Sequence, residues 1–452
     1  MPAPGLEAAG NITMTRTVKG PVAIVMGREQ TALGALRSLS LAGIPAHVAC
    51  PQGDLVSRSR WYRPTPGSPR WDGRPGPQAL DALRAMPIDR AVLIPCNDDA
   101  ALWASDLPYG QLAGRFLVSS SSRATLRILQ DKSRFGEFLA DTGIPHPRTF
   151  TIRSEADIAA IPFDDLDRVF VKPADSQKFL RTTGVKGLWA RNPDEFKAIW
   201  SRLDGQHLSV IAQEYIPGGA GDHYFIDGFR DRGGVLTALF ARRRVRIYPP
   251  DFGSSSYCES IPLLEVADAL AGLSELLARL EYRGIFSAEF KRDARDGSFR
   301  VLEVNTRAWW YVEFATRCGI NVVEMAWRDA QDMPVTSARS DYVTGSGCVN
   351  FRNDLATIFG RPPASRTPLS LAMRQWSSGY FNVFRWDDPV PGLQVAWQTI
   401  RRSLGWKLRR LFVRERRAQA RPAASGPTTC EADRTRVPEP AGEGEAASLP
   451  RP

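Results

Sequence analysis

The chain has 452 residues, of which 43% are hydrophobic and 24% are charged, a composition typical of a globular protein and not of a disordered or fibrous one. Its length predicts two or three subdomains instead of one hydrophobic core. The net charge of +10 does not indicate a nucleic-acid-binding core, because residues 401–421 hold nine Lys or Arg against one Glu and leave only +2 for the rest of the chain.

Membrane-spanning and secretory segments are not expected. No apolar run approaches the ~20 residues that span a bilayer, and residues 1–20 lack the basic start and apolar stretch of a signal peptide. The six cysteines show neither a pairing pattern nor a metal-binding spacing. We therefore expect reduced, mostly buried thiols in a cytoplasmic protein.

Short apolar strands alternate with helical patterns in residues 21–122, which predicts an α/β domain with a parallel sheet. Strands are expected at 21–27, 45–50, 91–96 and 116–120. Asn97, Asp98 and Asp99 follow the third strand, at the end where open α/β sheets bind ligands. A helix N-cap at Asn97 or Asp98 is nevertheless the favoured interpretation.

A second region begins after residue 122. One helix is predicted over 123–143, because a glycine followed by a proline is a common helix stop. Strand-like segments then dominate and predict an antiparallel sheet with helices. A helix at 263–282 leads into two strands that form a hairpin, with Asp296-Gly297 as the turn.

The segment "FRVLEVNTRAWW" (299–310) has polar residues at alternate positions of a strand. Side chains of a strand alternate between its two faces, so Glu303, Asn305 and Arg307 are expected on one face, with Glu289 near them across the hairpin. Two carboxylates and an amide oxygen form a ligand set that suits Mg²⁺. The alternative is a solvated strand face with a chance Glu–Arg pair.

Lys172 ends the apolar strand of "RVFVKPADS", where its ammonium group could neutralise phosphate oxygens. The following loop contains Ser176 and Gly184 and could close over phosphates with hydroxyl and backbone N–H groups. Most lysines at strand ends are simply solvated, so this segment alone is a moderate indication.

The segment "VIAQEYIPGGAGDHYF" (210–225) combines a strand with a Gly-rich turn. Backbone groups after Glu214 could hold an adenine, and Asp222 or His223 could contact the ribose. Taken alone, this segment is better interpreted as an ordinary strand and turn.

The order of these motifs resembles the ATP-grasp superfamily, and within it the carboxylate–amine ligases of the D-aspartate ligase kind. The resemblance rests on Asp131-Lys132, Phe170–Pro173, Gln213–Pro217, Glu289–Lys291 and Glu303–Arg307 and covers roughly residues 20–330. It implies an ATP-grasp fold with an N-terminal parallel-sheet α/β domain, a small lid and a C-terminal antiparallel-sheet subdomain, with ATP between the last two.

The resemblance also implies roles for individual residues. Lys132 and Lys172 would contact the nucleotide phosphates, and Arg307 would hold the acceptor carboxylate or the transferred phosphoryl group. The stretch that would hold adenine comprises Gln213, Glu214, Tyr215 and Ile216. The ligands of one or two Mg²⁺ ions would be Glu289, Glu303 and Asn305. Thr306 stands where related enzymes often have proline, and Arg242, Arg244 and Ser254 to Ser256 could contribute to the substrate pocket.

By this resemblance the protein would be an ATP- and Mg²⁺-dependent ligase that activates a carboxylate as an acyl phosphate and joins it to an amine. The alternatives are a non-catalytic nucleotide-binding sensor or scaffold, and a ligase or phosphotransferase with a different acceptor. The expected partners are a small carboxylate and a small amine and not nucleic acid; a homodimer is left open.

The remaining boundaries are predicted as follows. Residues 1–20 form a flexible leader, 21–122 the N-terminal domain, 123–335 the ATP-grasp domain with its lid at about 145–215, 336–392 a C-terminal extension, 393–421 a basic amphipathic helix and 422–452 a disordered tail. Apolar residues of the amphipathic helix form one stripe: Leu393, Trp397, Ile400, Leu404, Leu408 and Leu411. This stripe either docks on the protein's own core or lies on the inner face of an anionic membrane.

Overall fold

The structure is a computed structural model that describes residues 19–67, 70–173, 187–204, 210–250, 253–337, 340–360 and 367–401. The chain divides into two compact units, residues 1–399 and residues 400–452. The three sheets belong to the first unit. No helix in the described part of the chain is both long and apolar enough to cross a membrane.

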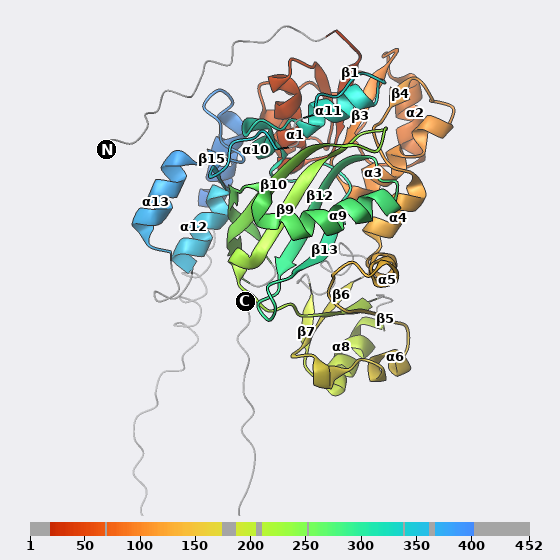
Figure 1. The fold of residues 1–452 in the computed structure, drawn as a ribbon. Helices are drawn as coiled ribbons and strands as arrows, with labels where there is room; N and C mark the ends of the chain where they lie inside the picture. Colours follow the sequence, from red (N-terminus) through yellow and green to blue (C-terminus); the bar gives the residue numbers. More distant parts are fainter. Residues whose placement is uncertain are drawn as a thin grey trace, which may run out of the picture. The chain divides into compact units, whose positions relative to one another are not determined.

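The first sheet is parallel and has the strand order β2-β1-β3-β4 (Figure 1). Its strands are β1 (Val22–Met26), β2 (Ala46–Ala49), β3 (Ala91–Pro95) and β4 (Phe116–Leu117). The connecting helices are α1 (Glu29–Leu41), α2 (Pro77–Ala85) and α3 (Asp98–Ala104), with short 3₁₀ turns at η1 (Leu55–Arg58) and η2 (Leu107–Tyr109). β1 and β3 are almost wholly apolar because side chains on both of their faces are buried.

The second sheet is small and antiparallel, with the order β5-β8-β6-β7. It consists of β5 (Thr149–Ile152), β6 (Val169–Pro173), β7 (Leu188–Ala190) and β8 (Val210–Glu214). The helices α6 (Glu155–Ala159) and α8 (Pro193–Asp204) accompany it, and a 3₁₀ turn, η3 (Phe163–Asp165), precedes β6. Phe196 of α8 and Ile158 of α6 are fully buried in the separate apolar core of this sheet.

The third sheet has seven strands in the order β13-β12-β9-β10-β11-β14-β15. Its strands are β9 (His223–Arg230), β10 (Leu236–Tyr248), β11 (Ser254–Ser260), β12 (Gly284–Arg292), β13 (Phe299–Asn305), β14 (Gly347–Val349) and β15 (Tyr380–Phe381). All pairs are antiparallel except β14 with β15. A short 3₁₀ turn, η4 (Ala220–Asp222), precedes β9, and another, η5 (Leu263–Val266), follows β11. The predicted combination of a parallel N-terminal sheet with antiparallel sheets is confirmed.

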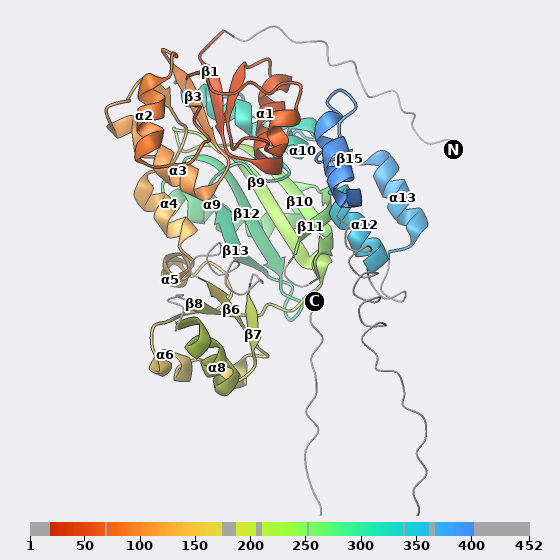
Figure 2. The ribbon, with the colours of Figure 1, turned by 180° about the vertical axis from the view of Figure 1, so that it is seen from behind.

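The two faces of the large sheet pack against different elements. Helix α9 (Ala267–Arg279) covers one face and forms an apolar core with Phe286 and Phe290 (Figure 1). The opposite face meets α1, α10 (Val312–Arg317) and α11 (Val322–Asp329), and Trp327 is fully buried there. Figure 2 shows α1 and α10 on this side.

Two predicted helices have different bounds in the structure. The helix predicted over 123–143 is two helices, α4 (Arg123–Gln130) and α5 (Lys132–Thr142), because Asp131 has extended backbone and caps α5 by accepting from Ser133 N and Arg134 N. The helix predicted to start at 263 starts at Ala267, after η5. The prediction of buried thiols is confirmed for the described residues, in which Cys50, Cys96, Cys258, Cys318 and Cys348 are buried and form no disulfide.

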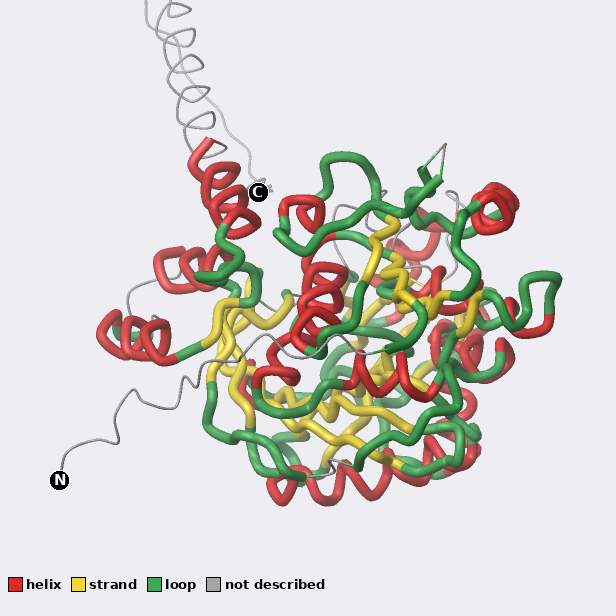
Figure 3. The backbone as a smooth tube through the Cα atoms, turned by 90° about the horizontal axis from the view of Figure 1, so that it is seen from above, coloured by secondary structure: helices red, strands yellow, loops and turns green. Residues whose placement is uncertain are grey.

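The C-terminal extension contains α12 (Phe351–Gly360) and α13 (Leu369–Ser378), and residues 390–401 are helical. Seen from above in Figure 3, these helices lie together at one side of the sheets. The division of the chain predicted from the sequence, including the lid at about 145–215, stays a prediction.

A buried ion cluster fixes the extension to the N-terminal sheet. Arg37 of α1, whose side chain is fully buried, donates to Asp388 at 3.0 Å, to Glu313 at 3.2 Å and to the carbonyl of Val383 at 2.9 Å. Glu313 also accepts from Arg385 at 3.1 Å. Elements more than 270 residues apart in sequence therefore meet at one guanidinium group.

Substituting Arg37→Met should lower the free energy of unfolding by about 3 kcal/mol, because two buried carboxylates would lose a charged partner. The matched control is Arg279→Met, which breaks a half-exposed pair with Glu275 on α9 and should change stability by less than about 0.5 kcal/mol. Denaturant unfolding measures both changes, and equal losses in the two variants would contradict the role of the cluster.

Candidate functional site

The β12–β13 hairpin places the predicted metal ligands side by side. Glu289 lies directly opposite Glu303 in the strand register, and Ser287 lies opposite Asn305. The side chain of Glu289 is mostly buried, whereas Glu303 is exposed. Asn305 Nδ2 donates to Glu303 Oε1 at 3.2 Å. These residues come together because residues of the same face in paired strands have adjacent Cβ atoms.

Glu289 is held by two basic side chains from neighbouring strands. His223 Nδ1 of β9 lies 2.9 Å and Arg244 Nη2 of β10 lies 3.0 Å from the same oxygen, Oε1. Burial by itself would raise the pKa of Glu289, but Arg244 and the hydrogen bond from His223 outweigh it and lower this pKa to about 2. Glu289 is therefore ionised at every pH at which the protein would work.

The chemistry of this donor set fits a hard divalent cation. Glu289, Glu303 and Asn305 offer carboxylate and amide oxygens from two rigid strands, and oxygen donors are what Mg²⁺ prefers. Within the described ranges, no group of three or more His, Cys, Asp or Glu side chains is placed to hold a metal ion. The candidate site therefore depends on the amide of Asn305 as its third donor.

Lys172 of β6 faces the same region. Its ammonium group donates to Gln213 Oε1 at 2.6 Å and lies 5.0 Å from the ring centre of Phe170. Burial lowers the pKa of Lys172 to about 8, although Glu303 acts in the opposite direction; Lys132 and Lys291 lower it further. The segments that carry Lys132, Lys172 and Glu303 thus lie close enough for their charges to act on one another.

The predicted adenine segment follows directly from β8. The Gln213 side chain bridges Lys172 and Thr149, and the Glu214 carboxylate accepts from Arg295 at 2.7 Å and from the backbone N–H of Arg148 at 3.1 Å. Both side chains are therefore occupied within the protein. What remains for a base is the backbone beyond Glu214 and the apolar side chain of Ile216, which is buried.

Tyr215 is packed between two cations. The guanidinium carbon of Arg168 lies 4.2 Å and the Lys291 ammonium 4.7 Å from its ring centre, distances typical of cation–π contacts. Trp189 of β7 meets the same ring edge-on at 5.3 Å. This stack joins the small sheet to β12 of the large sheet.

The residues predicted at the ribose have different surroundings. Asp222 accepts from the backbone N–H of Gly219 at 2.7 Å, whereas His223 contacts Glu289 at the candidate metal site. Burial lowers the pKa of His223, more than its hydrogen bond to Glu289 raises it. Ser176 and Gly184 of the predicted phosphate loop lie outside the described residues.

β13 ends at Asn305, so Arg307 lies two residues beyond the strand. The alternation of buried and less buried residues continues to Arg307, and its place on the face of Glu303 and Asn305 stays a prediction. Its Nε donates to Asp98 Oδ1 at 3.1 Å, and Asp98 lies in the first turn of α3, directly after the third parallel strand. The predicted N-cap is confirmed at Asn97, which accepts from Ala100 N at 2.8 Å.

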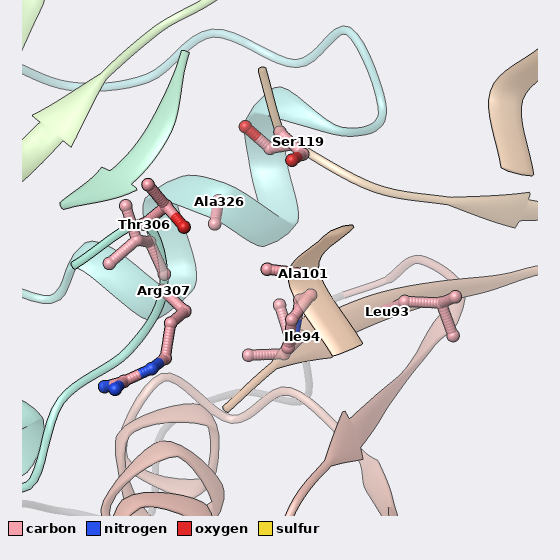
Figure 4. A pocket seen from close by; sticks show the side chains of 10 residues that line it. Leu93, Ile94, Ala101, Ser119, Thr306, Arg307 and Ala326 are labelled. Atoms are coloured by element: carbon pink, nitrogen blue, oxygen red, sulfur yellow. The ribbon is translucent and has the colours of Figure 1, made fainter. Parts of the chain in front are cut away.

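A small cavity lies beside Arg307. Its volume of about 20 Å³ admits no more than a single water molecule. Figure 4 shows the Arg307 guanidinium pointing away from Ser119, and Thr306 beside it. Thr306, the departure from proline noted in the sequence, accepts a hydrogen bond from Gln130 at 2.9 Å. The end of β13 is thereby tied to the junction of α4 and α5.

The predicted pocket residues on β10 and β11 are used inside the protein. Arg242 is buried, donates to Asp227 at 2.7 Å and stacks on Phe225 at 3.8 Å. Arg244 donates to Ser255 as well as to Glu289, and Ser256 is fully buried. Of these, Arg244 is the one that reaches the candidate metal site.

Sequence reasoning missed several residues of the site. Lys291 was named only as the end of the motif Glu289–Lys291 and was given no role, although it lies two positions after Glu289 on the same strand face. Arg127 and Arg134, together with Leu102, Gln130 and Asp131, line an open cavity of about 270 Å³. Nothing in the local sequence distinguishes these two arginines from ordinary solvated helix residues.

A known enzyme resembles part of this sequence, although no protein-family model matches the chain. A curated D-aspartate ligase from Enterococcus faecium (strain Aus0004) is 23% identical over 248 residues, which cover 53% of this chain and 58% of that protein. The match thus spans little more than half the length of this curated relative.

Two solved structures resemble the fold over most of its length. One is the biotin carboxylase domain of a Hydrogenobacter thermophilus 2-oxoglutarate carboxylase with MgADP, ADP and bicarbonate (TM-score 0.55, 14% identity, 72% of this chain and 73% of that chain). The other is a Staphylococcus aureus N5-carboxyaminoimidazole synthetase complexed with ADP (TM-score 0.56, 12% identity, 76% and 86%). The chain thus has the ATP-grasp fold of these structures. The resemblance found in its sequence motifs is confirmed at this level, and the roles of single residues stay predictions.

Any binding of ADP through Lys172 should weaken as the pH rises from about 7 to about 9.5. The pKa of Lys172 is about 8, so its positive charge is largely present at neutral pH and is lost as the pH passes through that value. Lys172→Arg keeps its charge throughout this range, because guanidinium titrates above about pH 12. Equilibrium binding of ADP measures the effect, and equal pH slopes for both proteins would contradict it.

Proposed function

We propose that this protein is an ATP- and Mg²⁺-dependent ligase that joins a carboxylate to an amine. The observation that carries the proposal is the in-register pair Glu289–Glu303, whose face is shared with Asn305 and whose charges act on Lys172. The match to a D-aspartate ligase supports the reaction class. The MgADP bound to one structural neighbour supports the cofactors.

The residues have the following roles in the proposal. Glu289, Glu303 and Asn305 would hold Mg²⁺, which when bound neutralises phosphate charge. Lys172 and Lys132 would contact the phosphates, and the backbone beyond Glu214 with Ile216 would hold the adenine. Arg244 and His223 would fix the orientation of Glu289, since both bind its Oε1 and leave its other oxygen for the cation.

The proposed reaction has two steps. An oxygen of the substrate carboxylate attacks the terminal phosphorus of ATP, which forms an acyl phosphate and releases ADP. The amine nitrogen then attacks the acyl carbon and loses a proton as phosphate leaves, which forms the amide. Lys172 and Arg307 would stabilise the negative charge that gathers during phosphoryl transfer. No side-chain nucleophile takes part.

We infer from the cavity at α4 and α5 that one of the substrates carries an anionic group. Arg127 and Arg134 line it, and neither guanidinium group has an ion-pair partner in the described part of the chain. Gln130, which also lines the cavity, donates to Thr306 next to Arg307. The cavity therefore adjoins the end of β13 and could hold a carboxylate that is not itself activated.

Two alternatives remain for the same fold. A sensor or scaffold would bind the nucleotide without turnover, and a ligase or phosphotransferase could use a hydroxyl or thiol acceptor. A screen of amino acids and small carboxylates for release of ADP and phosphate separates them. ATP binding without product release from any substrate pair would favour the sensor.

Glu303→Gln and Lys172→Ala should each lower substrate-dependent ADP release by about 10²–10³-fold. The first weakens the hold on Mg²⁺, and the second removes a positive charge that stabilises the transferred phosphoryl group. The folded state should persist, since both groups lie at the edge of the packed cores. Glu275→Gln on the exposed side of α9 is the matched control and should turn over normally. Undiminished turnover in either site variant would place the active site elsewhere.

Replacing Arg127 and Arg134 together by alanine should raise the KM for the anionic substrate about tenfold or more and leave kcat nearly unchanged, the pattern expected when uniform binding energy is lost. Steady-state kinetics provide the measurement. Arg279→Ala serves as the control for removing an exposed arginine from a helix. A fall in kcat at unchanged KM would contradict a substrate-binding role.

A further inference from the structure

Lys291 of β12 is a buried lysine without a carboxylate partner. Its side chain is only 8% exposed, and its ammonium group makes neither an ion pair nor a hydrogen bond with the part of the chain that the structure describes. The ammonium lies 4.7 Å from the ring centre of Tyr215. A cation–π contact offsets part of the cost of burying a charge, but it provides no acceptor for the three N–H donors of a lysine. Lys291 therefore has donors to offer to a ligand.

The carboxylates near Lys291 are engaged elsewhere. The charges of Asp222 and Glu289 act on Lys291, but neither group forms an ion pair with it. Asp222 accepts from a backbone N–H of its own turn at 2.7 Å. Glu289 Oε1 accepts from His223 and Arg244. A buried charge that lacks a partner is costly, and such a group calls for an explanation beyond packing.

Lys291 lies between the two ends of the proposed nucleotide site. On one side it contacts Tyr215, which belongs to the stretch that would hold adenine. On the other side it shares a strand face with Glu289, which would hold Mg²⁺ at the phosphates, and residues two positions apart on a strand are about 7 Å apart. Its charge also acts on Lys172. A nucleotide that spans this site would bring the link between its ribose and its phosphates to Lys291.

We propose that Lys291 binds the α-phosphate, the innermost phosphate of the nucleotide, an inference that rests on the proposed function. The base and the ribose offer only neutral acceptors, whereas the α-phosphate carries negative charge in ATP, ADP and AMP alike. A lysine ammonium is a compact point charge that binds phosphate without a fixed fork geometry. The α-phosphate is therefore the group at this position that neutralises a buried cation and accepts its hydrogen bonds.

The test compares the binding of ADP, AMP and adenosine to the full-length protein, the last two by competition with labelled ADP. AMP keeps the α-phosphate and lacks the outer phosphates, whereas adenosine has no phosphate. Lys291→Met removes the charge and keeps the length of the side chain. It should weaken the binding of ADP and of AMP about tenfold, because a hydrogen bond to a charged group is lost, and leave the binding of adenosine unchanged.

Two further variants complete the design. Lys197→Met removes a half-buried lysine of α8 that has no role in the proposal, and it should bind all three ligands like wild type. Lys291→Arg keeps the positive charge and should retain most of the preference for AMP over adenosine. The wild-type protein itself should bind AMP about tenfold more tightly than adenosine, a comparison that does not depend on the folding of any variant.

Four outcomes would overturn the proposal. Wild-type protein that binds adenosine as tightly as AMP makes no contact with the α-phosphate. Unchanged AMP binding by Lys291→Met gives Lys291 a structural role and leaves the proposed function intact, since ADP still binds. An equal loss for AMP and adenosine assigns Lys291 to the base or the ribose. The absence of ADP binding by the wild-type protein removes this inference together with the proposed function.

Discussion

Two carboxylates directly opposite each other on paired strands are the constraint around which this structure is arranged. Glu289 and Glu303 would repel each other if they were left alone on their shared face. β9 supplies His223 and β10 supplies Arg244, which bind Glu289 and keep its pKa at about 2. β6 of the small sheet supplies Lys172, whose charge acts on the same face. The negative charges of one hairpin are thus offset by basic residues from three other strands.

The same hairpin is tied to the N-terminal sheet. Arg307, just beyond the end of β13, binds Asp98 at the start of α3, and Thr306 binds Gln130 at the end of α4. The N-terminal sheet thus meets the hairpin at the carboxyl ends of its parallel strands, the edge at which open α/β sheets generally bind ligands. The proposed ligase would use this meeting point to place a carboxylate beside the nucleotide phosphates.

The C-terminal extension places a buried charged residue and an exposed aromatic residue close together in sequence. Asp388 is buried and holds Arg37, whereas Trp386, two residues earlier, is almost wholly exposed. The polar residues of this segment face inward to a buried ion cluster and an aromatic side chain faces outward. This inversion of the usual distribution separates the extension from an ordinary surface segment.

Local patterns in the sequence determined the fold class, the strands of the parallel sheet, the helix cap at Asn97 and the shared face of Glu303 and Asn305, because alternation and capping depend on neighbours along the chain. Tertiary structure alone decided the partners of these residues. Arg244 meets Glu289 across 45 positions, and Arg307, beyond the end of β13, meets Asp98 across 209. A surface arginine and a buried one look alike in sequence, since burial is set by elements that fold against them from distant parts of the chain.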